Sequence, residues 1–221
     1  MSLFLIEMSF FTDNFKYMVL NHNIMVKDGQ FVLDTEKLNI LKLFIEHQEE
    51  TFSIRQIALK RGINYKSAYN AVEQLNEEGV INLLKHGNIT LCSFNRIFND
   101  SVFKVEYHRL MELLKDKNFK VMYTRFCAIN KQFILLLFGS YAKNKQTKHS
   151  DIDLLLICDD LEYIKNQIKL LPLPIHLTSI SYADFRTMLL SKEFTVVSEA
   201  IKKNIILFGI EDYYRLVNNA R

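Results

Sequence analysis

The 221-residue chain has few of the residues that mark loose or disulfide-bonded proteins: two prolines, six glycines and three cysteines. Few prolines and glycines leave few flexible loops, so we expect its domains to be joined by a helix. Cys92, Cys127 and Cys158 are odd in number, widely spaced and without a C-x-x-C pair. This pattern predicts reduced, mostly buried thiols and excludes a disulfide framework, a paired-cysteine zinc site or a redox pair.

Long uncharged apolar runs are also missing. The apolar stretch at residues 1–11 contains Glu7, lacks a basic leader and is too short to span a bilayer. The run Phe133–Phe138 has the length of a buried strand. We therefore expect a cytoplasmic protein with no membrane partner, in which residues 1–30 form a packing segment.

Neither sign of charge is in large excess, with 28 Lys and Arg, 25 Asp and Glu, and a net charge of +3. So small a charge does not by itself indicate a polyanionic partner, and only local clusters of basic residues bear on nucleic-acid binding. Charged residues make up 24% and hydrophobic residues 49%, as is typical of soluble globular proteins. A chain of this length can bury two small cores, and we expect two domains.

Residues 34–92 predict three short helices followed by two strands. The first helix has one apolar face and a capping residue at Asp34 or Thr35. The second begins at a Ser-x-x-Gln capping box at Ser53 and stops at Gly62. The third is capped by Asn64 and ends near residue 78, and the strands are expected over 80–84 and 89–92, joined by a hairpin turn.

This order of elements resembles a winged helix-turn-helix domain, which we place at residues 31–95. The resemblance implies that the third helix enters the major groove of double-stranded DNA while the hairpin touches the backbone nearby. The DNA-binding residues it implies lie on the outer face of that helix and at the hairpin tip: Tyr65, Lys66, Ser67, Tyr69, Asn70 and Lys85.

A second interpretation of the same surface is a solvated face used for dimerisation or for docking a protein. Glu73, Glu77 and Glu78 on the later part of the third helix would repel nearby phosphates. We expect double-stranded DNA as the partner. A homodimer, formed through the apolar amino terminus or the winged helix, is a further expectation.

Residues 96–131 form the predicted connecting region. Apolar residues at helical spacing predict an amphipathic helix over Val102–Leu114. The stretch 118–131 fits either a strand, because Phe119, Val121 and Tyr123 alternate, or a helix, and it stays open.

The chemistry-bearing residues are expected to follow. Phe133–Phe138 reads as a buried strand that ends at Gly139-Ser140, and Asp151-Ile152-Asp153 opens a second strand ten residues later. Adjacent strands would bring the two motifs together. Because strand side chains alternate between faces, both carboxylates share one face and Ile152 points into the core.

Phe138-Gly-Ser-Tyr-Ala-Lys143 followed by Ser150-Asp-Ile-Asp-Leu154 resembles the DNA polymerase beta type of nucleotidyltransferase, in its minimal single-domain form. The resemblance covers residues 132–217 and predicts a nucleotidyltransferase domain over 132–221, with a mixed sheet, flanking helices and an α+β fold for the whole chain. It implies that Gly139 and Ser140 hold a nucleoside triphosphate and that Asp151 and Asp153 bind Mg²⁺ or Mn²⁺. The chemistry agrees, since glycine lets the backbone approach phosphate and carboxylates are hard ligands for Mg²⁺.

The sequence departs from that family at its third carboxylate, which would be expected near His176. An imidazole there could act as a catalytic base or metal ligand, because histidine exchanges protons near neutral pH, or it could be a packing residue. Asp184 and Glu193 are candidates for a displaced acid, although capping is the simpler role for Asp184. Lys143, Lys145 and Lys148 between the motifs could steer the phosphates of the nucleotide, although a charge run of this kind is more often a solvated face.

Two functions stay open at this stage. The first is an enzyme that transfers a nucleoside monophosphate from a nucleoside triphosphate to an unidentified acceptor, using Asp151, Asp153 and His176. The second is a DNA-binding regulator, or antitoxin-like protein, whose degenerate transferase domain only binds nucleotide or a partner. The departure at His176 favours the second.

Overall fold

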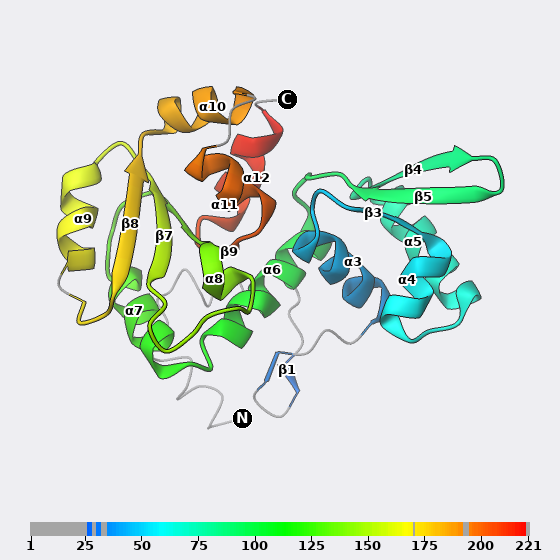
Figure 1. The fold of residues 1–221 in the computed structure, drawn as a ribbon, viewed down its shortest axis with the longest axis horizontal. Helices are drawn as coiled ribbons and strands as arrows, with labels where there is room; N and C mark the ends of the chain where they lie inside the picture. Colours follow the sequence, from blue (N-terminus) through cyan, green and yellow to red (C-terminus); the bar gives the residue numbers. More distant parts are fainter. Residues whose placement is uncertain (1–25, 28–29, 32–34, 170, 192–194, 220–221) are drawn as a thin grey trace.

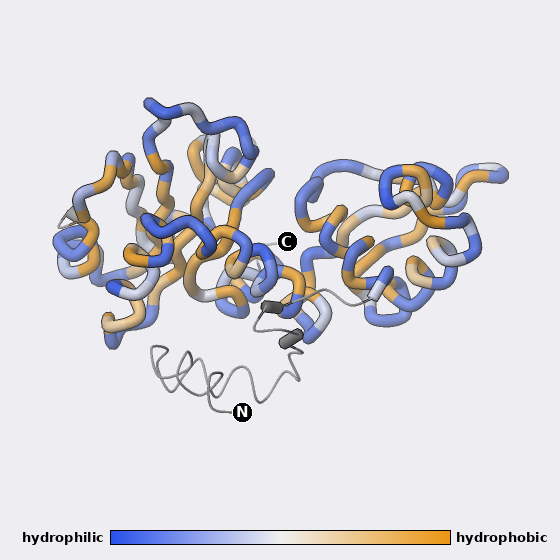
Figure 2. The backbone as a smooth tube through the Cα atoms, turned by 90° about the horizontal axis from the view of Figure 1, so that it is seen from below, coloured by the Kyte–Doolittle hydropathy of each residue, from blue (hydrophilic) through white to orange (hydrophobic). Residues whose placement is uncertain are grey.

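The chain folds into two lobes on either side of helix α6 (Asp100–Leu113) (Figure 1). This computed structural model describes residues 26–27, 30–31, 35–169, 171–191 and 195–219. Hydrophobic segments run through the interior of both lobes, and hydrophilic segments follow their edges (Figure 2). The expected packing segment at residues 1–30 lies almost wholly outside the described residues, apart from a short β1 (Val26–Lys27) and the first residue of β2 (Gln30–Phe31).

The helices of the amino-terminal lobe begin at the capping residues that the sequence predicts. Thr35 accepts a hydrogen bond from the amide of Leu38 at 3.3 Å and starts α3 (Glu36–Glu46). Ser53 and Gln56 form the capping box of α4 (Ile54–Arg61), which ends at a left-handed Gly62. The side chain of Asn64 caps α5 (Tyr65–Glu77). Local hydrogen-bonding chemistry therefore sets the start of each helix.

A three-stranded antiparallel sheet completes this lobe, in the order β3-β5-β4. Strands β4 (Ile81–His86) and β5 (Ile89–Phe94) form the predicted hairpin, which turns at Gly87 with φ +59°. Strand β3 (Thr51–Ser53) was not predicted, because it is only three residues long and its pairing partner β5 lies far along the chain. The resulting order is helix, strand, helix, helix, hairpin.

The connecting region contains two helices, α6 and α7 (Lys117–Cys127). The stretch that the sequence left open is therefore a helix. Asp116 caps its start, and Phe119, Met122, Tyr123 and Phe126 are buried along one side. Val121, which fitted a strand-like alternation, is 53% exposed, so the helical period determines which side chains are buried.

A four-stranded mixed sheet in the order β8-β7-β6-β9 forms the centre of the carboxyl-terminal lobe. Strand β6 (Ile134–Leu137) is antiparallel to β7 (Ile152–Ile157) and to β9 (Ile205–Phe208), whereas β7 and β8 (Ile175–Ile180) are parallel. The flanking helices are α8 (Gly139–Ala142), α9 (Leu161–Lys169), α10 (Tyr182–Leu190), α11 (Val196–Lys202) and α12 (Ile210–Asn218). Every residue of β6 is fully buried, as its uninterrupted apolar sequence predicts.

Helix α6 is attached to the carboxyl-terminal lobe by a buried polar network. Arg109 donates to Glu106 at 2.6 Å and to the backbone carbonyl of Asn204, and the Tyr214 hydroxyl donates to Glu106 at 2.7 Å. Glu106 is completely buried and Arg109 is 5% exposed. The same helix packs against α3 of the other lobe, so α6 belongs to the structure of both lobes. None of the described helices is long and apolar enough to cross a membrane.

Candidate nucleotide site

The turn that follows β6 lies directly against the side chain of Asp153. Gly139 has φ +67°, and a Cβ added there would lie 2.1 Å from Asp153 Oδ2 and 2.9 Å from its Cγ. No side chain other than that of glycine fits, because the space is filled and the left-handed backbone is strained for other residues. Phe138 fixes the register by donating its amide to the Asp153 carbonyl at 3.0 Å.

Asp151 and Asp153 flank a buried residue at the start of β7. Ile152 is 3% exposed, while the side chain of Asp153 is 26% exposed and Asp151 is open to solvent. The alternation of side chains along an extended chain directs both carboxylates away from the core. The predicted pairing of the two motifs on adjacent strands is confirmed, since β6 and β7 are direct neighbours.

His176 lies beside Asp153 on the next strand. The two residues are register partners in the parallel β7–β8 pair, and His176 Nδ1 lies 3.2 Å from Asp153 Oδ1. The side chain of His176 is 67% exposed, so the packing interpretation of this residue is wrong. An imidazole therefore stands at the solvent edge of the site, hydrogen-bonded to one of its carboxylates.

Asp184 is not a displaced third acid. Asp184 follows the carboxyl end of β8, whereas His176 is near the amino end of that strand. The extended chain from His176 to the α10 cap Ser181 spans roughly 16 Å, at about 3.3 Å per residue. Asp184 Oδ2 accepts a hydrogen bond from Ser181 Oγ, and Ser181 is the cap of α10. The simpler interpretation of Asp184, a role at the start of a helix, is therefore confirmed, and its alternative as a displaced acid is not. Glu193 lies outside the described residues.

The loop between the motifs is held by local hydrogen bonds and by an ion pair to helix α11. Thr147 donates its amide to Ser150 Oγ at 2.8 Å, and Lys143 forms an ion pair with Glu199 at 2.7 Å. Ser140 occupies the first turn of α8, immediately after Gly139, and is half-buried. Ser140 is therefore one residue away from the turn that contacts Asp153.

No group of three histidine, cysteine or acidic side chains gathers as a metal site among the described residues. The set at hand is two carboxylates, Asp151 and Asp153, with the neighbouring His176. Mg²⁺ is commonly bound by one or two carboxylates together with substrate phosphates and water, so two acids fit that ion only in combination with a polyphosphate.

The residues predicted to bind DNA lie at the surface of α5 and, for Lys85, of strand β4. Tyr65 and Tyr69 are 57% and 43% exposed on α5, and their rings stack 6.5 Å apart. Glu73, one turn further on, hydrogen-bonds Tyr69; its charge and this hydrogen bond raise the pKa of the Tyr69 hydroxyl. The remaining predicted residues are also at the surface, with Lys66, Asn70 and Lys85 exposed and Ser67 half-buried.

Residues 128–213 match the family model described as polymerase beta, nucleotidyltransferase. The match supports the polymerase beta superfamily for this part of the chain. It extends from the end of α7 into α12 and contains the glycine turn, both aspartates and His176. No curated protein and no solved structure matches the chain significantly.

The sequence indicated the members of the site but not their contacts. Strand register determines two of these contacts. One is the packing of the Asp153 side chain against Gly139, and the other is the hydrogen bond between Asp153 and His176. A Gly-Ser pair after an apolar strand indicates the turn. Nothing local in the sequence specifies which carboxylate will pack against the Cα of that glycine.

Proposed function

We propose that the chain is a nucleotidyltransferase that moves a nucleoside monophosphate from a nucleoside triphosphate to an acceptor hydroxyl. The observation that carries the proposal is that Gly139, Asp153 and His176 lie together at the same end of three neighbouring strands, β6, β7 and β8. All three residues belong to the segment that matches the family model. A winged helix-turn-helix in the amino-terminal lobe would position the enzyme on double-stranded DNA.

Each side chain has a role consistent with its position. At the turn that contacts Asp153, the backbone amides after Gly139 and the Ser140 hydroxyl would donate to phosphate oxygens. Asp151 and Asp153 would hold Mg²⁺ or Mn²⁺, which when bound supplies charge neutralisation for the polyphosphate. Asp153 orients His176 through their hydrogen bond, and the exposed imidazole would accept the proton of the acceptor hydroxyl.

The test is transfer of a labelled nucleoside monophosphate to the protein itself or to cell extract in the presence of Mg²⁺ or Mn²⁺. We expect Asp151→Asn/Asp153→Asn to abolish the signal, and His176→Ala to lower it by about 10²-fold if the imidazole takes the proton. Asp184→Asn is the matched control, because this acid is at the other end of β8. Transfer that survives in the double variant would refute the assignment.

The amino-terminal lobe supports the DNA part of the proposal through its element order and its basic residues. Arg55 and Lys60 on α4, Lys66 on α5 and Lys85 on the hairpin are all exposed. A winged helix would place α5 in the major groove and the β4–β5 hairpin along the backbone. Duplex binding that weakens steeply with rising salt is the expected result.

One observation favours a second function, a DNA-binding regulator whose transferase domain binds nucleotide without turning it over. The position expected to hold a third carboxylate carries His176, which is not an acid. In that case labelled nucleotide would bind in an Asp153-dependent manner, no transfer would occur with either metal, and duplex binding would persist.

A further inference from the structure

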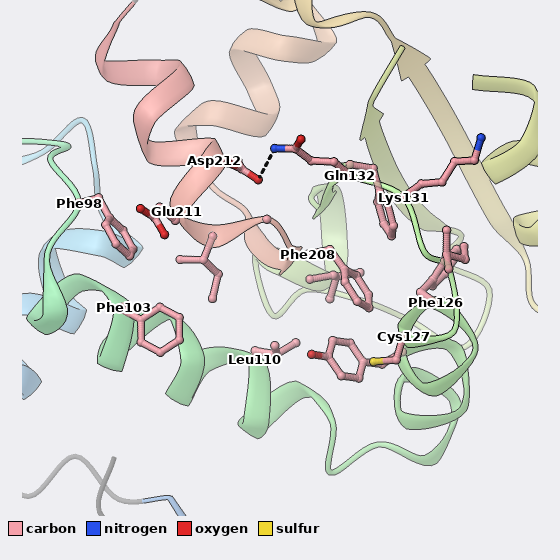
Figure 3. A pocket seen from close by; sticks show the side chains of 16 residues that line it. Phe98, Phe103, Leu110, Phe126, Cys127, Lys131, Gln132, Phe208, Glu211 and Asp212 are labelled. Carbon is pink, nitrogen blue, oxygen red and sulfur yellow. Dashed lines mark hydrogen bonds between the residues drawn. The ribbon is translucent and has the colours of Figure 1, made fainter. Parts of the chain in front are cut away.

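A hollow lined by described residues lies at the end of the sheet opposite to the aspartates. It has a volume of about 360 Å³ and is lined by α6, α7, the start of β6 and the turn from β9 into α12 (Figure 3). Phe208 of β9 pairs with Leu135 at the start of β6, whereas Gly139 follows the end of that strand. The hollow is therefore separate from the candidate nucleotide site.

Much of its wall is aromatic. The ring of Phe208 stacks on that of Tyr123, with 4.6 Å between the ring centroids. Its centroid is also 6.0 Å from that of Phe126 and 5.2 Å from that of Phe133. Phe98 and Phe103 line the other side of the hollow. Cavities of this size, lined by apolar rings with a few polar groups, are the usual form of small-molecule sites, and an apolar wall left open to water is costly.

The charge at the rim is negative. Asp212 accepts a hydrogen bond from Gln132 at 3.2 Å, and Glu211 lies beside Phe98 (Figure 3). Arg215 forms an ion pair with Glu211 at 2.5 Å from the next turn of α12. Within the described part of the chain, Asp212 forms no ion pair with a cation. Lys131 also borders the hollow, but its ammonium group turns away to Asp160 and to the ring of Tyr163.

We propose that this hollow binds a small molecule with a flat apolar body and a cationic nitrogen. The rings of Phe98, Phe103 and Phe208 would contact the body. The carboxylate of Asp212 would attract the cation, with a smaller contribution from Glu211, whose charge is partly offset by Arg215. An anion is disfavoured, because both carboxylates lie at the start of α12 and offset the positive end of its dipole. The bound molecule would contact α6 and α12 together, and the site is independent of the proposed transferase activity.

The test uses three naphthalene probes of nearly equal shape: naphthylmethylammonium, naphthylmethanol and naphthylacetate. Binding to the full chain is followed by titration calorimetry and by the fluorescence anisotropy of the probe, since the protein has no tryptophan. We expect the cation to bind about tenfold more tightly than the neutral probe, and the anion to bind most weakly.

Variants separate the rim from the wall. Glu211→Gln/Asp212→Asn should remove the preference for the cation while naphthylmethanol binding is unchanged, and Phe98→Ala should weaken all three probes. Glu162→Gln, an 82% exposed acid on α9, is the control for loss of one surface charge and should change nothing. Circular dichroism checks that each variant is folded.

Equal binding of the three probes would mean a merely apolar crevice and would overturn the proposal. Absence of binding by all three would overturn it as well, as would a preference for the cation that survives in the rim variant.

Discussion

Replacing Arg109 with methionine tests whether the buried network around α6 holds the carboxyl-terminal lobe together. Arg109 is 5% exposed, and its guanidinium group makes the hydrogen bonds to Glu106 and to the Asn204 carbonyl. Burial alone would lower the pKa of this guanidinium, but the adjacent Glu106 carboxylate raises it above the usual range. Arg109→Met leaves a completely buried carboxylate whose remaining hydrogen bond comes from Tyr214.

Breaking a buried ion pair by removal of one partner costs about 3–5 kcal/mol, mostly because the other charge remains buried without compensation. We therefore expect Arg109→Met to lower the free energy of unfolding by about 3–5 kcal/mol. Glu106→Gln/Arg109→Met removes the stranded charge while an amide oxygen still accepts from Tyr214. This double variant should recover roughly 1.5–3 kcal/mol of the loss, since contacting residues are not additive.

The assay is urea unfolding followed by far-ultraviolet circular dichroism, with Arg215→Met as the control. Arg215 also pairs with a glutamate, Glu211, but its side chain is 69% exposed, so its loss should cost less than about 1 kcal/mol. The reasoning fails if Arg109→Met costs no more than this control, or if the double variant is no more stable than the single one.

Three further predictions concern the sites. In a nucleotide-binding assay, Gly139→Ala should abolish binding and Gly62→Ala should not. Both glycines have φ near +66°, but only a Cβ at Gly139 would meet Asp153. Equal effects of the two substitutions would contradict this prediction. Burial raises the pKa of the Cys92 thiol to about 11. At pH 8, Cys92 should therefore be alkylated far more slowly in the native protein than in urea, as followed by mass spectrometry. Equal rates would disprove its burial. Lys66→Ala and Lys85→Ala should each reduce the slope of log K against log salt concentration for duplex binding by about one unit. Lys117→Ala on α7 is the control and should leave the slope unchanged. Equal slopes for the three variants would argue against the predicted DNA surface.

Local signals in the sequence predicted the starts of the helices well. Thr35, Ser53 and Asn64 each cap the helix expected to follow them, because a cap needs only a side chain and an amide two or three residues away. The turn at Gly139 and the apolar run of β6 were predicted for the same reason. Such features depend on neighbours in the chain and not on the rest of the fold.

Features that depend on distant pairing could not be predicted in this way. Strand β3 exists through its pairing with β5, and α7 was ambiguous until the sheet beneath it determined which side chains are buried. The choice between the two roles of Asp184 depended on the topology as well, since only the topology places it at the opposite end of β8 from His176. Partners from distant segments also make up the Glu106 network, and the sequence analysis did not anticipate it.

Because α6 packs against both lobes, any attempt to study the halves separately must decide which half keeps it. A fragment starting at residue 132 would leave the Asn204 carbonyl and the Tyr214 hydroxyl facing water where Arg109 and Glu106 now stand. A fragment ending at residue 95 would uncover the surface of α3 that α6 protects. Cutting the chain just before residue 96 keeps α6 and its buried Glu106–Arg109 pair with the carboxyl-terminal lobe, but it removes the packing of α6 against α3.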